Sequence, residues 1–121
     1  MLELELPYPP SVNHYFRMVG RRVLISREGR AFRTHVCSTL AALGVRPLEG
    51  PLAVEVEVYP PDNRRRDIDN TMKALLDALQ HGGAYRDDSQ IVRLVIEKCA
   101  PVEGGRTLVR IGHSVRNKPC F

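Results

Sequence analysis

Residues 52–59 are the segment that most restricts how this chain folds. Large aliphatic residues occupy every second position, at Leu52, Val54, Val56 and Val58, and Ala53, Glu55, Glu57 and Tyr59 lie between them. Successive side chains of a β-strand point to opposite faces, so this alternation predicts a strand with one buried and one exposed side. Residues 2–6 alternate leucine with glutamate in the same way. Two such strands need a second layer that covers their aliphatic faces.

Two amphipathic segments provide that layer. Ser26 is a favoured helix N-cap, and apolar residues follow it at helical spacing until Gly44. Apolar residues recur again at helical spacing from Ile68 to Leu79 and stop before Gly82. The sequence therefore predicts two main helices. Their apolar positions are Phe32, Val36, Leu40 and Leu43 in the first, and Ile68, Met72, Leu75, Leu76 and Leu79 in the second. Arg27, Arg30 and Arg33 are expected on the solvent side of the first helix, as a solvated face or as a secondary DNA-contact surface.

Further strands complete the predicted sheet. Residues 23–25 and 91–99 are apolar and rich in β-branched side chains, which favours strands. Glu103-Gly104-Gly105 predicts a hairpin turn that pairs the strand at 91–99 with a partner at 107–113. The expected order is β-(β)-α-β-α-β-β. This is a small α/β (α+β) fold with a mixed β-sheet.

The rest of the chain is expected to be irregular. Residues 7–22 begin with a proline-rich stretch and are predicted to form one long loop. The tail from residue 114 to 121 is short and polar, and we expect it to fray. No repeat, low-complexity segment or linker is visible. A length of 121 residues is therefore expected to form a single domain spanning residues 1–121.

Composition limits the possible classes of protein. The chain has no apolar run of about 18 residues, which argues against a membrane-spanning helix. Its N-terminus lacks the basic-then-apolar layout of a signal peptide, and its three cysteines have no metal-ligand spacing. We therefore expect a cytoplasmic protein with reduced thiols. The net charge of +4 fits a nucleic acid or a small acidic substrate. The absence of tryptophan and the scarcity of aromatics argue against a stacking platform for single strands.

The polar segment between the second predicted strand and helix carries most of the chemistry. Arg64-Arg65-Arg66 leads directly into Asp67, Asp69 and Lys73. Asp67 is predicted at the helix N-cap and Asp69 in the first turn, where carboxylate oxygens suit a hard divalent cation. Each feature also has a purely structural interpretation, as a helix cap or a solvated loop. Together they place phosphate-binding cations beside a metal site, which phosphodiester hydrolysis needs.

A second acidic pair, Asp87-Asp88, follows the predicted second helix. Aspartates are common in turns because they bond their own backbone, so the pair has a structural interpretation. Alternatively, Asp88 supplies a third ligand to the cation at Asp67 and Asp69. The four histidines show no zinc spacing, and the chain has no nucleophilic triad or glycine-rich phosphate loop. Any hydrolysis would therefore be metal-assisted.

These motifs resemble the RusA family of Holliday junction resolvases, and the similarity covers nearly the whole chain. The family implies an α/β fold, a homodimer and a Mg²⁺-dependent nuclease in which Mn²⁺ can substitute. The substrate it implies is branched double-stranded DNA, the four-way junction. The matching segments are Pro9-Pro10-Ser11-Val12-Asn13 with Tyr15 and Arg17, Pro61-Asp62 with the arginine run, Asp67-Ile68-Asp69-Asn70, Lys73 to Leu79, and Asp87-Asp88 with Gln90 and Val92.

The resemblance also assigns expected roles to individual residues. Asp67, Asp69 and Asp88 are expected to be catalytic carboxylates and metal ligands, and Lys73 the catalytic lysine. Asn63 stands where the arginine run of relatives can be longer, which is expected to weaken DNA affinity without changing the chemistry. Six residues are expected to bind DNA: Asn13, Arg17, Arg64, Arg65, Arg66 and Asn70.

The expected function is structure-selective cleavage of four-way DNA junctions by paired, metal-dependent phosphodiester hydrolysis. Paired cuts suit a two-fold dimer that presents two copies of one site. One alternative is a non-catalytic junction-binding module in which the aspartates only cap a helix and shape a turn. Another is a metal-dependent enzyme that acts on a small phosphorylated substrate.

Overall fold

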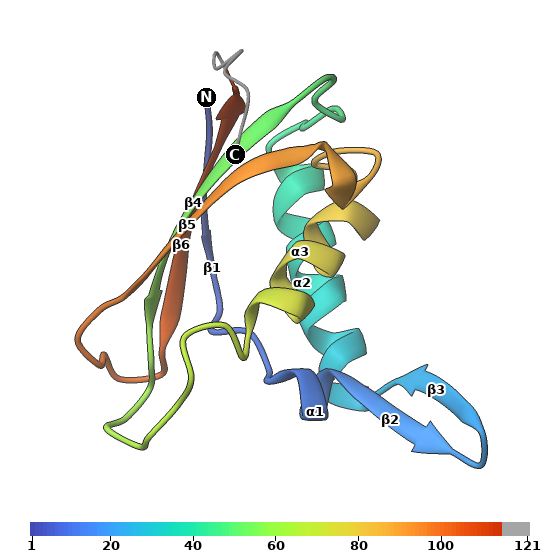
Figure 1. Cartoon of the computed structure of the whole chain (residues 1–121), viewed down its shortest axis with the longest axis vertical. Helices are drawn as coiled ribbons and strands as arrows, with labels where there is room; N and C mark the ends of the chain where they lie inside the picture. Colours follow the sequence, from blue (N-terminus) through green and yellow to red (C-terminus); the bar gives the residue numbers. More distant parts are fainter. Residues whose placement is uncertain (115–121) are drawn as a thin grey trace, which may run out of the picture.

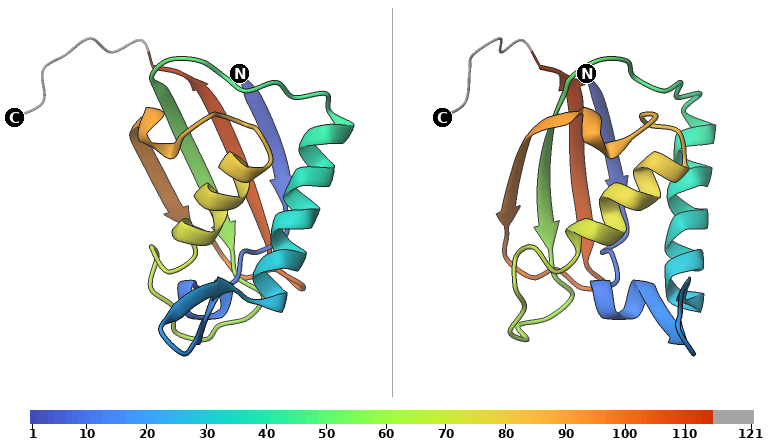
Figure 2. Two further views of the ribbon diagram at one scale, coloured as in Figure 1. Left: turned by 90° about the vertical axis from the view of Figure 1, so that its right-hand side faces the viewer. Right: turned by 45° about the vertical axis from the view of Figure 1, so that its right-hand side comes forward.

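The computed structural model describes residues 1–114, and the expected fraying of the tail beyond residue 114 concerns residues outside this range. Over these residues a four-stranded sheet is covered on one face by two helices, and a separate two-stranded hairpin projects from one end (Figures 1 and 2). This confirms the predicted α+β class with a mixed sheet and two main helices. The sheet has the order β1-β6-β4-β5, with β1 at Leu2–Leu6, β4 at Leu52–Tyr59, β5 at Ile91–Lys98 and β6 at Arg106–His113.

The predicted two-sided character of β4 is confirmed. Val54, Val56 and Val58 are buried toward the helices, while Glu55 and Glu57 point to the opposite face. Strand β4 is central, because it pairs in parallel with β5 and antiparallel with β6. Ion pairs across neighbouring strands cover the exposed face of the sheet. They are Glu5–Arg106 and Glu3–Arg110 at 3.6 Å, Glu55–Arg93 at 3.7 Å and Glu57–Arg110 at 3.9 Å.

The helices α2 (Arg27–Ala42) and α3 (Met72–His81) pack on the buried face of the sheet (Figure 2). The predicted cap of α2 is confirmed, because the Gly29 amide donates to Ser26 Oγ at 2.9 Å. Leu43 lies beyond the helix end and is 58% exposed, so it is not part of the apolar stripe. The buried apolar residues of the two helices are Phe32, Val36, Leu40, Met72, Leu75 and Leu79.

The predicted start of the second main helix at Ile68 is wrong. Residues 68–71 form successive turns, and α3 begins at Met72 after Thr71. Ile68 has the spacing of the apolar stripe, but its side chain is 44% exposed and does not pack in the core. Asp67 is therefore not the N-cap of α3, and Asp69 does not lie in its first turn. Both precede the helix in a tight turn.

The prediction of a single loop at residues 7–22 is also wrong. This region contains α1 (Val12–Tyr15) and β2 (Phe16–Val19), and β2 pairs with β3 (Arg22–Ile25) in a hairpin. The hairpin turns at Gly20, whose φ is +62°. A glycine with positive φ at the first of two loop residues matches the backbone twist of a tight hairpin. The strand predicted at 23–25 therefore lies in the hairpin and outside the main sheet.

The predicted hairpin between the last two strands does not form. Strand β6 pairs with β1 and β4, while β5 pairs only with β4 among the described residues. The connection from β5 to β6 passes the end of β4, where the Cys99 amide donates to Val58 O at 2.8 Å and the Val102 amide to Pro60 O at 2.9 Å. Gly104 and Gly105 have positive φ and allow the turn, but its strands flank β4.

Candidate active site

The loop between β4 and the turn at 67–71 is held by Asp62. Its carboxylate accepts from the Arg66 guanidinium at 2.8 Å and from the Arg64 amide at 3.0 Å. These interactions hold the pKa of Asp62 below its ordinary value. Arg66 also lies over the Tyr8 ring at 5.8 Å, and Lys98 Nζ donates to Arg66 O at 2.9 Å. These ion-pair and hydrogen-bond contacts therefore fix the conformation of the loop that leads to Asp67.

Asp67 and Asp69 lie together in the turn that precedes α3. The Asn70 amide donates to Asp67 O at 3.2 Å, and the Met72 amide donates to Asp69 O at 3.1 Å. Both carboxylates are exposed and accept no hydrogen bond from any residue of 1–114. The backbone thus fixes the turn while the carboxylate oxygens stay available.

The N-terminal motif contacts this same turn. The Val12 amide, at the start of α1, donates to Asn70 O at 2.9 Å. Asn13 follows directly and is exposed, and Arg17 lies on the exposed part of β2. Two segments more than fifty residues apart in the sequence therefore meet at one end of the molecule, as Figure 1 shows for α1 and the start of α3. Five of the predicted residues gather here: Asn13, Asp67, Asp69, Asn70 and Lys73.

Lys73 is exposed in the first turn of α3, and Asp77 lies one turn further on. The Asp77 carboxylate accepts from the buried Tyr15 hydroxyl and pairs with Arg33 at 2.7 Å. This cluster of Tyr15, Arg33 and Asp77 joins α1, α2 and α3. Arg33 therefore turns inward, and the prediction that it lies on the solvent side with Arg27 and Arg30 is wrong.

Sequence reasoning missed this cluster as a unit. Asp77 falls outside the apolar spacing of α3 at Met72, Leu75, Leu76 and Leu79, so the sequence pattern carries no signal of its partners. Burial and the hydrogen bond to Asp77 raise the pKa of Tyr15 to about 12, so the hydroxyl remains a donor. The cluster holds α1 against α3, and with it the contact between Val12 and Asn70.

We expect Asp77→Asn to lower the free energy of unfolding by about 1–3 kcal/mol at neutral pH, because Arg33 loses its charged partner. Burial raises the pKa of Asp77, but hydrogen bonds from Tyr15 and Arg33 outweigh burial and hold the pKa below its ordinary value. The carboxylate therefore stabilises the fold above pH 4, and this contribution is lost as pH falls through the lowered pKa.

Urea unfolding of wild type and Asp77→Asn between pH 3 and pH 7 measures this difference. The difference in the free energy of unfolding between the two proteins should be largest at neutral pH and should decrease steadily below about pH 4. A difference of constant size over that range would contradict the assigned ionisation. Glu55→Gln is the matched control, because Glu55 is a partly exposed carboxylate whose ion pair with Arg93 is 3.7 Å long.

Asp87 and Asp88 lie at the other end of α3. The Asp87 carboxylate accepts from the Ser89 amide at 2.8 Å and caps η1 (Asp88–Gln90), a 3₁₀ turn. Asp87 therefore has the structural role of a turn residue. The Asp88 amide donates to Gln80 Oε1 at 2.8 Å, near the C-terminal end of α3, and its carboxylate is exposed.

The structure does not bring Asp88 to Asp67 and Asp69 within one chain. Helix α3 has 10 residues, so it separates the two acidic positions by about 15 Å. Figure 1 shows the loop after α3 at the end of the molecule opposite α1. Within residues 1–114 no group of three His, Cys, Asp or Glu side chains is arranged to hold a metal ion. A single chain therefore presents the pair Asp67 and Asp69 alone.

The three arginines of the run differ in their surroundings. Arg66 pairs with Asp62 and lies over the Tyr8 ring, so its charge is partly neutralised within the protein. Arg64 lies 3.7 Å from Asp62 with a largely exposed side chain. Arg65 is exposed and has no ion pair with any of residues 1–114. Arg65 is therefore the member of the run most available to a phosphate.

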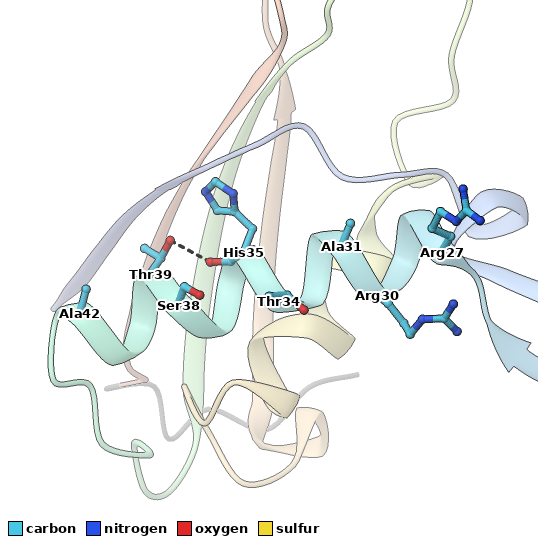
Figure 3. A pocket seen from close by; sticks show the side chains of 8 residues that line it. All are labelled: Arg27, Arg30, Ala31, Thr34, His35, Ser38, Thr39 and Ala42. Atoms are coloured by element: carbon cyan, nitrogen blue, oxygen red, sulfur yellow. Dashed lines mark hydrogen bonds between the residues drawn. The ribbon is translucent and has the colours of Figure 1, made fainter.

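A shallow groove follows the outer face of α2 (Figure 3). No carboxylate lines it, and Arg27 and Arg30 lie at the end nearest the hairpin, where Figure 3 shows both side chains extending from the helix. Arg27 and Arg30 are both exposed at this end of the groove, as predicted from the sequence. The groove is lined by Arg27, Arg30, Ala31, Thr34, His35, Ser38, Thr39 and Ala42.

Comparison with known proteins places this chain among the endodeoxyribonucleases. The sequence profile described as "Endodeoxyribonuclease RusA" matches residues 7–112. The "Crossover junction endodeoxyribonuclease RusA" of Escherichia coli strain K12 is 38% identical over 115 residues, covering 91% of this chain and 95% of the relative. Proteins named "Crossover junction endodeoxyribonuclease rusA" from Enterobacteria phages 82 and HK97 are each 38% identical, covering 91% and 88% of this chain and 95% and 89% of the relatives.

The chain therefore belongs to the RusA family of crossover junction endodeoxyribonucleases. The resemblance predicted from the sequence motifs is confirmed at the level of the family. In the described residues no helix has both the length and the apolar character needed to cross a membrane.

Proposed function

We propose that this protein cuts four-way DNA junctions by paired, metal-dependent phosphodiester hydrolysis. The observation that carries the proposal is the turn of Asp67 and Asp69, whose free carboxylates lie beside Lys73 and the arginine run. Carboxylates, a lysine and arginines at one exposed position match a phosphodiester substrate in both charge and chemistry.

The proposed cofactor is Mg²⁺, with Mn²⁺ as a substitute. Asp67 and Asp69 fit it, because they offer oxygen ligands on a turn fixed by backbone hydrogen bonds. When bound, the metal supplies charge stabilisation at the scissile phosphate and lowers the pKa of an attacking water.

The remaining chemistry belongs to side chains of the protein. Lys73 carries a positive charge in the first turn of α3 and stabilises negative charge that develops on the phosphate. The Asp77 cluster holds the first turns of α3 in place and so orients Lys73. Arg65 and Arg64 contact phosphates outside the cut site and set the position of the backbone. Selectivity is proposed to depend on the shape of the junction and on contacts to its backbone.

The active unit is proposed to be a homodimer in which Asp88 acts across subunits. Within one chain Asp88 lies about one helix length from Asp69. A two-fold axis that passes across the middle of α3 places the C-terminal end of the partner subunit's α3 beside the N-terminal end of this one. The partner subunit's Asp88 then approaches Asp67 and Asp69, and the symmetry repeats the arrangement at a second site. Two sites in one dimer suit paired incisions.

Strand β5 offers an interface for this dimer. It is an edge strand among the described residues, and Val92, Leu94 and Val95 are each at least 39% exposed. Leu94 pairs with the buried Val54 and so lies on the side of the sheet that carries the helices. An uncovered apolar edge beside α3 favours association with a second copy.

The location proposed is the cytoplasm. Cys37 and Cys99 are free thiols, as a reducing compartment allows.

The direct test is incubation with a synthetic four-way junction and with a linear duplex, each with and without Mg²⁺. We expect cuts at symmetric positions in two opposite strands of the junction, only with metal, and none in the duplex. Junction binding without cleavage under every metal condition would leave the non-catalytic binding module as the function.

The salt dependence of junction binding tests the role assigned to Arg65. Arg65→Ala should reduce the magnitude of the slope of log K against log[salt] by about 1, because one phosphate contact fewer releases fewer counterions. Arg46→Ala is the matched control, since Arg46 is an exposed arginine in the connection between α2 and β4. Equal slopes for wild type and Arg65→Ala would contradict contact between this residue and a phosphate. A slope near zero for wild type would favour a small substrate.

A further inference from the structure

The β2–β3 hairpin is anchored only at its base. Its first pair, Phe16 and Ile25, is partly buried against the core, and the Ser26 amide donates to Tyr15 O at 2.9 Å. Gly29 lies directly against the Tyr15 carbonyl, where a Cβ would clash, so α2 packs closely on α1 at this point. Beyond this base the ribbon extends away from the rest of the molecule, as Figure 1 shows.

The exposed part of the hairpin has one apolar face. Met18 and Val23 are directly paired across the strands, so both side chains point to the same side as Phe16 and Ile25. Met18 is 68% exposed and Val23 is 60% exposed. With α1 this face forms a groove of about 400 Å³, a size typical of ligand clefts. The groove is lined by Val12, Asn13, Phe16, Arg17, Met18 and Val23.

The charges around the groove favour a nucleic acid. Residues 13–27 contain four arginines and no acidic residue. None of these four arginines forms an ion pair with residues 1–114, although Glu28 interacts electrostatically with Arg27. An apolar groove that Arg17 lines, on a segment with three further arginines, matches a flat base attached to a phosphate backbone better than a protein surface. The four are Arg17, Arg21, Arg22 and Arg27.

The groove adjoins the turn that carries the proposed catalytic carboxylates. Val12 lines the groove, and its amide donates to Asn70 O at 2.9 Å, next to Asp69. A nucleotide whose phosphate lies at Asp67 and Asp69 therefore has its neighbours within reach of the hairpin. The Asn13 amide in the lining has the donor and acceptor that hydrogen bonding to a base edge requires.

We propose that the groove between α1 and the β2–β3 hairpin binds an unstacked nucleobase at the branch point of the junction, next to the scissile phosphate. The proposal rests on the proposed function and identifies how this site recognises a branch. When a junction is held open, a base pair at the branch point is stacked on one side only, so removing its base from the stack costs less than in a duplex. Apolar side chains that enter between bases are a known way to stabilise such distortion.

Fluorescence of 2-aminopurine tests this proposal directly. The probe replaces single adenines on each side of the crossover of a four-way junction, and binding is measured in EDTA so that no strand is cut. Wild type should raise the fluorescence at one position beside the crossover and not in the matching linear duplex. The double variant Met18→Ser/Val23→Thr should abolish this rise and weaken junction binding about tenfold, the size expected from losing one base contact.

The matched control is Leu43→Ser, which removes an exposed aliphatic side chain at the opposite end of α2 from the hairpin. It should behave as wild type in fluorescence and affinity. Circular dichroism and thermal unfolding identify any loss of fold, and Met18→Ala alone provides a milder change that should give an intermediate fluorescence rise.

Two results would overturn the inference while leaving the proposed function in place. One is an unchanged fluorescence rise in the double variant, and the other is junction cleavage by wild type with no rise at any position. If the double variant is monomeric in sedimentation while wild type is dimeric, the hairpin face is a subunit contact and the inference also fails. Wild type that neither prefers nor cuts junctions would overturn both proposals.

Discussion

Asp69→Asn is expected to lower the rate of junction cleavage in Mg²⁺ at least about a thousand-fold while junction binding persists. A bound metal contributes several kcal/mol of charge stabilisation in phosphoryl chemistry, and about 1.4 kcal/mol corresponds to a factor of ten in rate. Asp69 is exposed, and only its backbone carbonyl takes part in the turn, so the amide side chain preserves the fold. Single-turnover cleavage of a labelled four-way junction measures the rate, and gel mobility measures binding.

The control for this experiment is Glu3→Gln, which removes one exposed negative charge from the outer face of the sheet. Its cleavage rate should equal that of wild type. Cleavage by Asp69→Asn at a rate close to wild type would remove Asp69 from the catalytic site and with it the metal site proposed here.

A mixed dimer of one Asp69→Asn subunit and one Asp88→Asn subunit is expected to regain activity that each homodimer lacks. If the partner subunit's Asp88 completes the site, the two substitutions fall in the same site of the mixed dimer, and the second site is intact. If Asp88 acts within its own chain, both sites are broken and the mixed dimer is inactive. The expected rate of strand incision is about half that of wild type, since one of two symmetric sites works.

Coexpression with two different affinity tags and sequential purification gives the mixed dimer. On a supercoiled plasmid with a cruciform, the mixed dimer should produce nicked circles and wild type should produce linear molecules. The control is a mixed dimer in which both tagged subunits carry Asp69→Asn, which has no intact site in either arrangement. Inactivity of the Asp69→Asn/Asp88→Asn dimer would contradict the proposed site across subunits.

Much of the fold was predictable because its strongest patterns are local. The alternation at residues 52–59 and the apolar spacing after Ser26 each reflect burial of one side of an element. The start of α3 was not predictable from spacing, because Ile68 matches the stripe and yet lies in a turn that exposes it. The pairing of β6 with β4 depends on contacts between distant segments, which turn residues such as Gly104 and Gly105 do not encode.

The candidate site was predicted in its residue types and only partly in its geometry. The motif of Asp67 and Asp69 was visible, and so was the available arginine run. The separation of Asp88 from them follows from the length of α3 and the turn capped by Asp87, which fix where the chain returns to the sheet. The hairpin was missed because Arg17 and Arg22 interrupt the apolar pattern of its short strands. Gly20 was the signal that could have revealed it.

The ladder of glutamates and arginines on the outer face of the sheet has a consequence for how this protein meets its substrate. Each of these arginines has a carboxylate within 4 Å, so the outer face of the sheet produces little net electrostatic field. The excess cations lie away from the outer face of the sheet, in the arginine run, at Lys73, around the hairpin and at the start of α2. An approaching polyanion is therefore attracted toward these segments and not toward the outer face of the sheet, and the encounter is oriented before any contact forms.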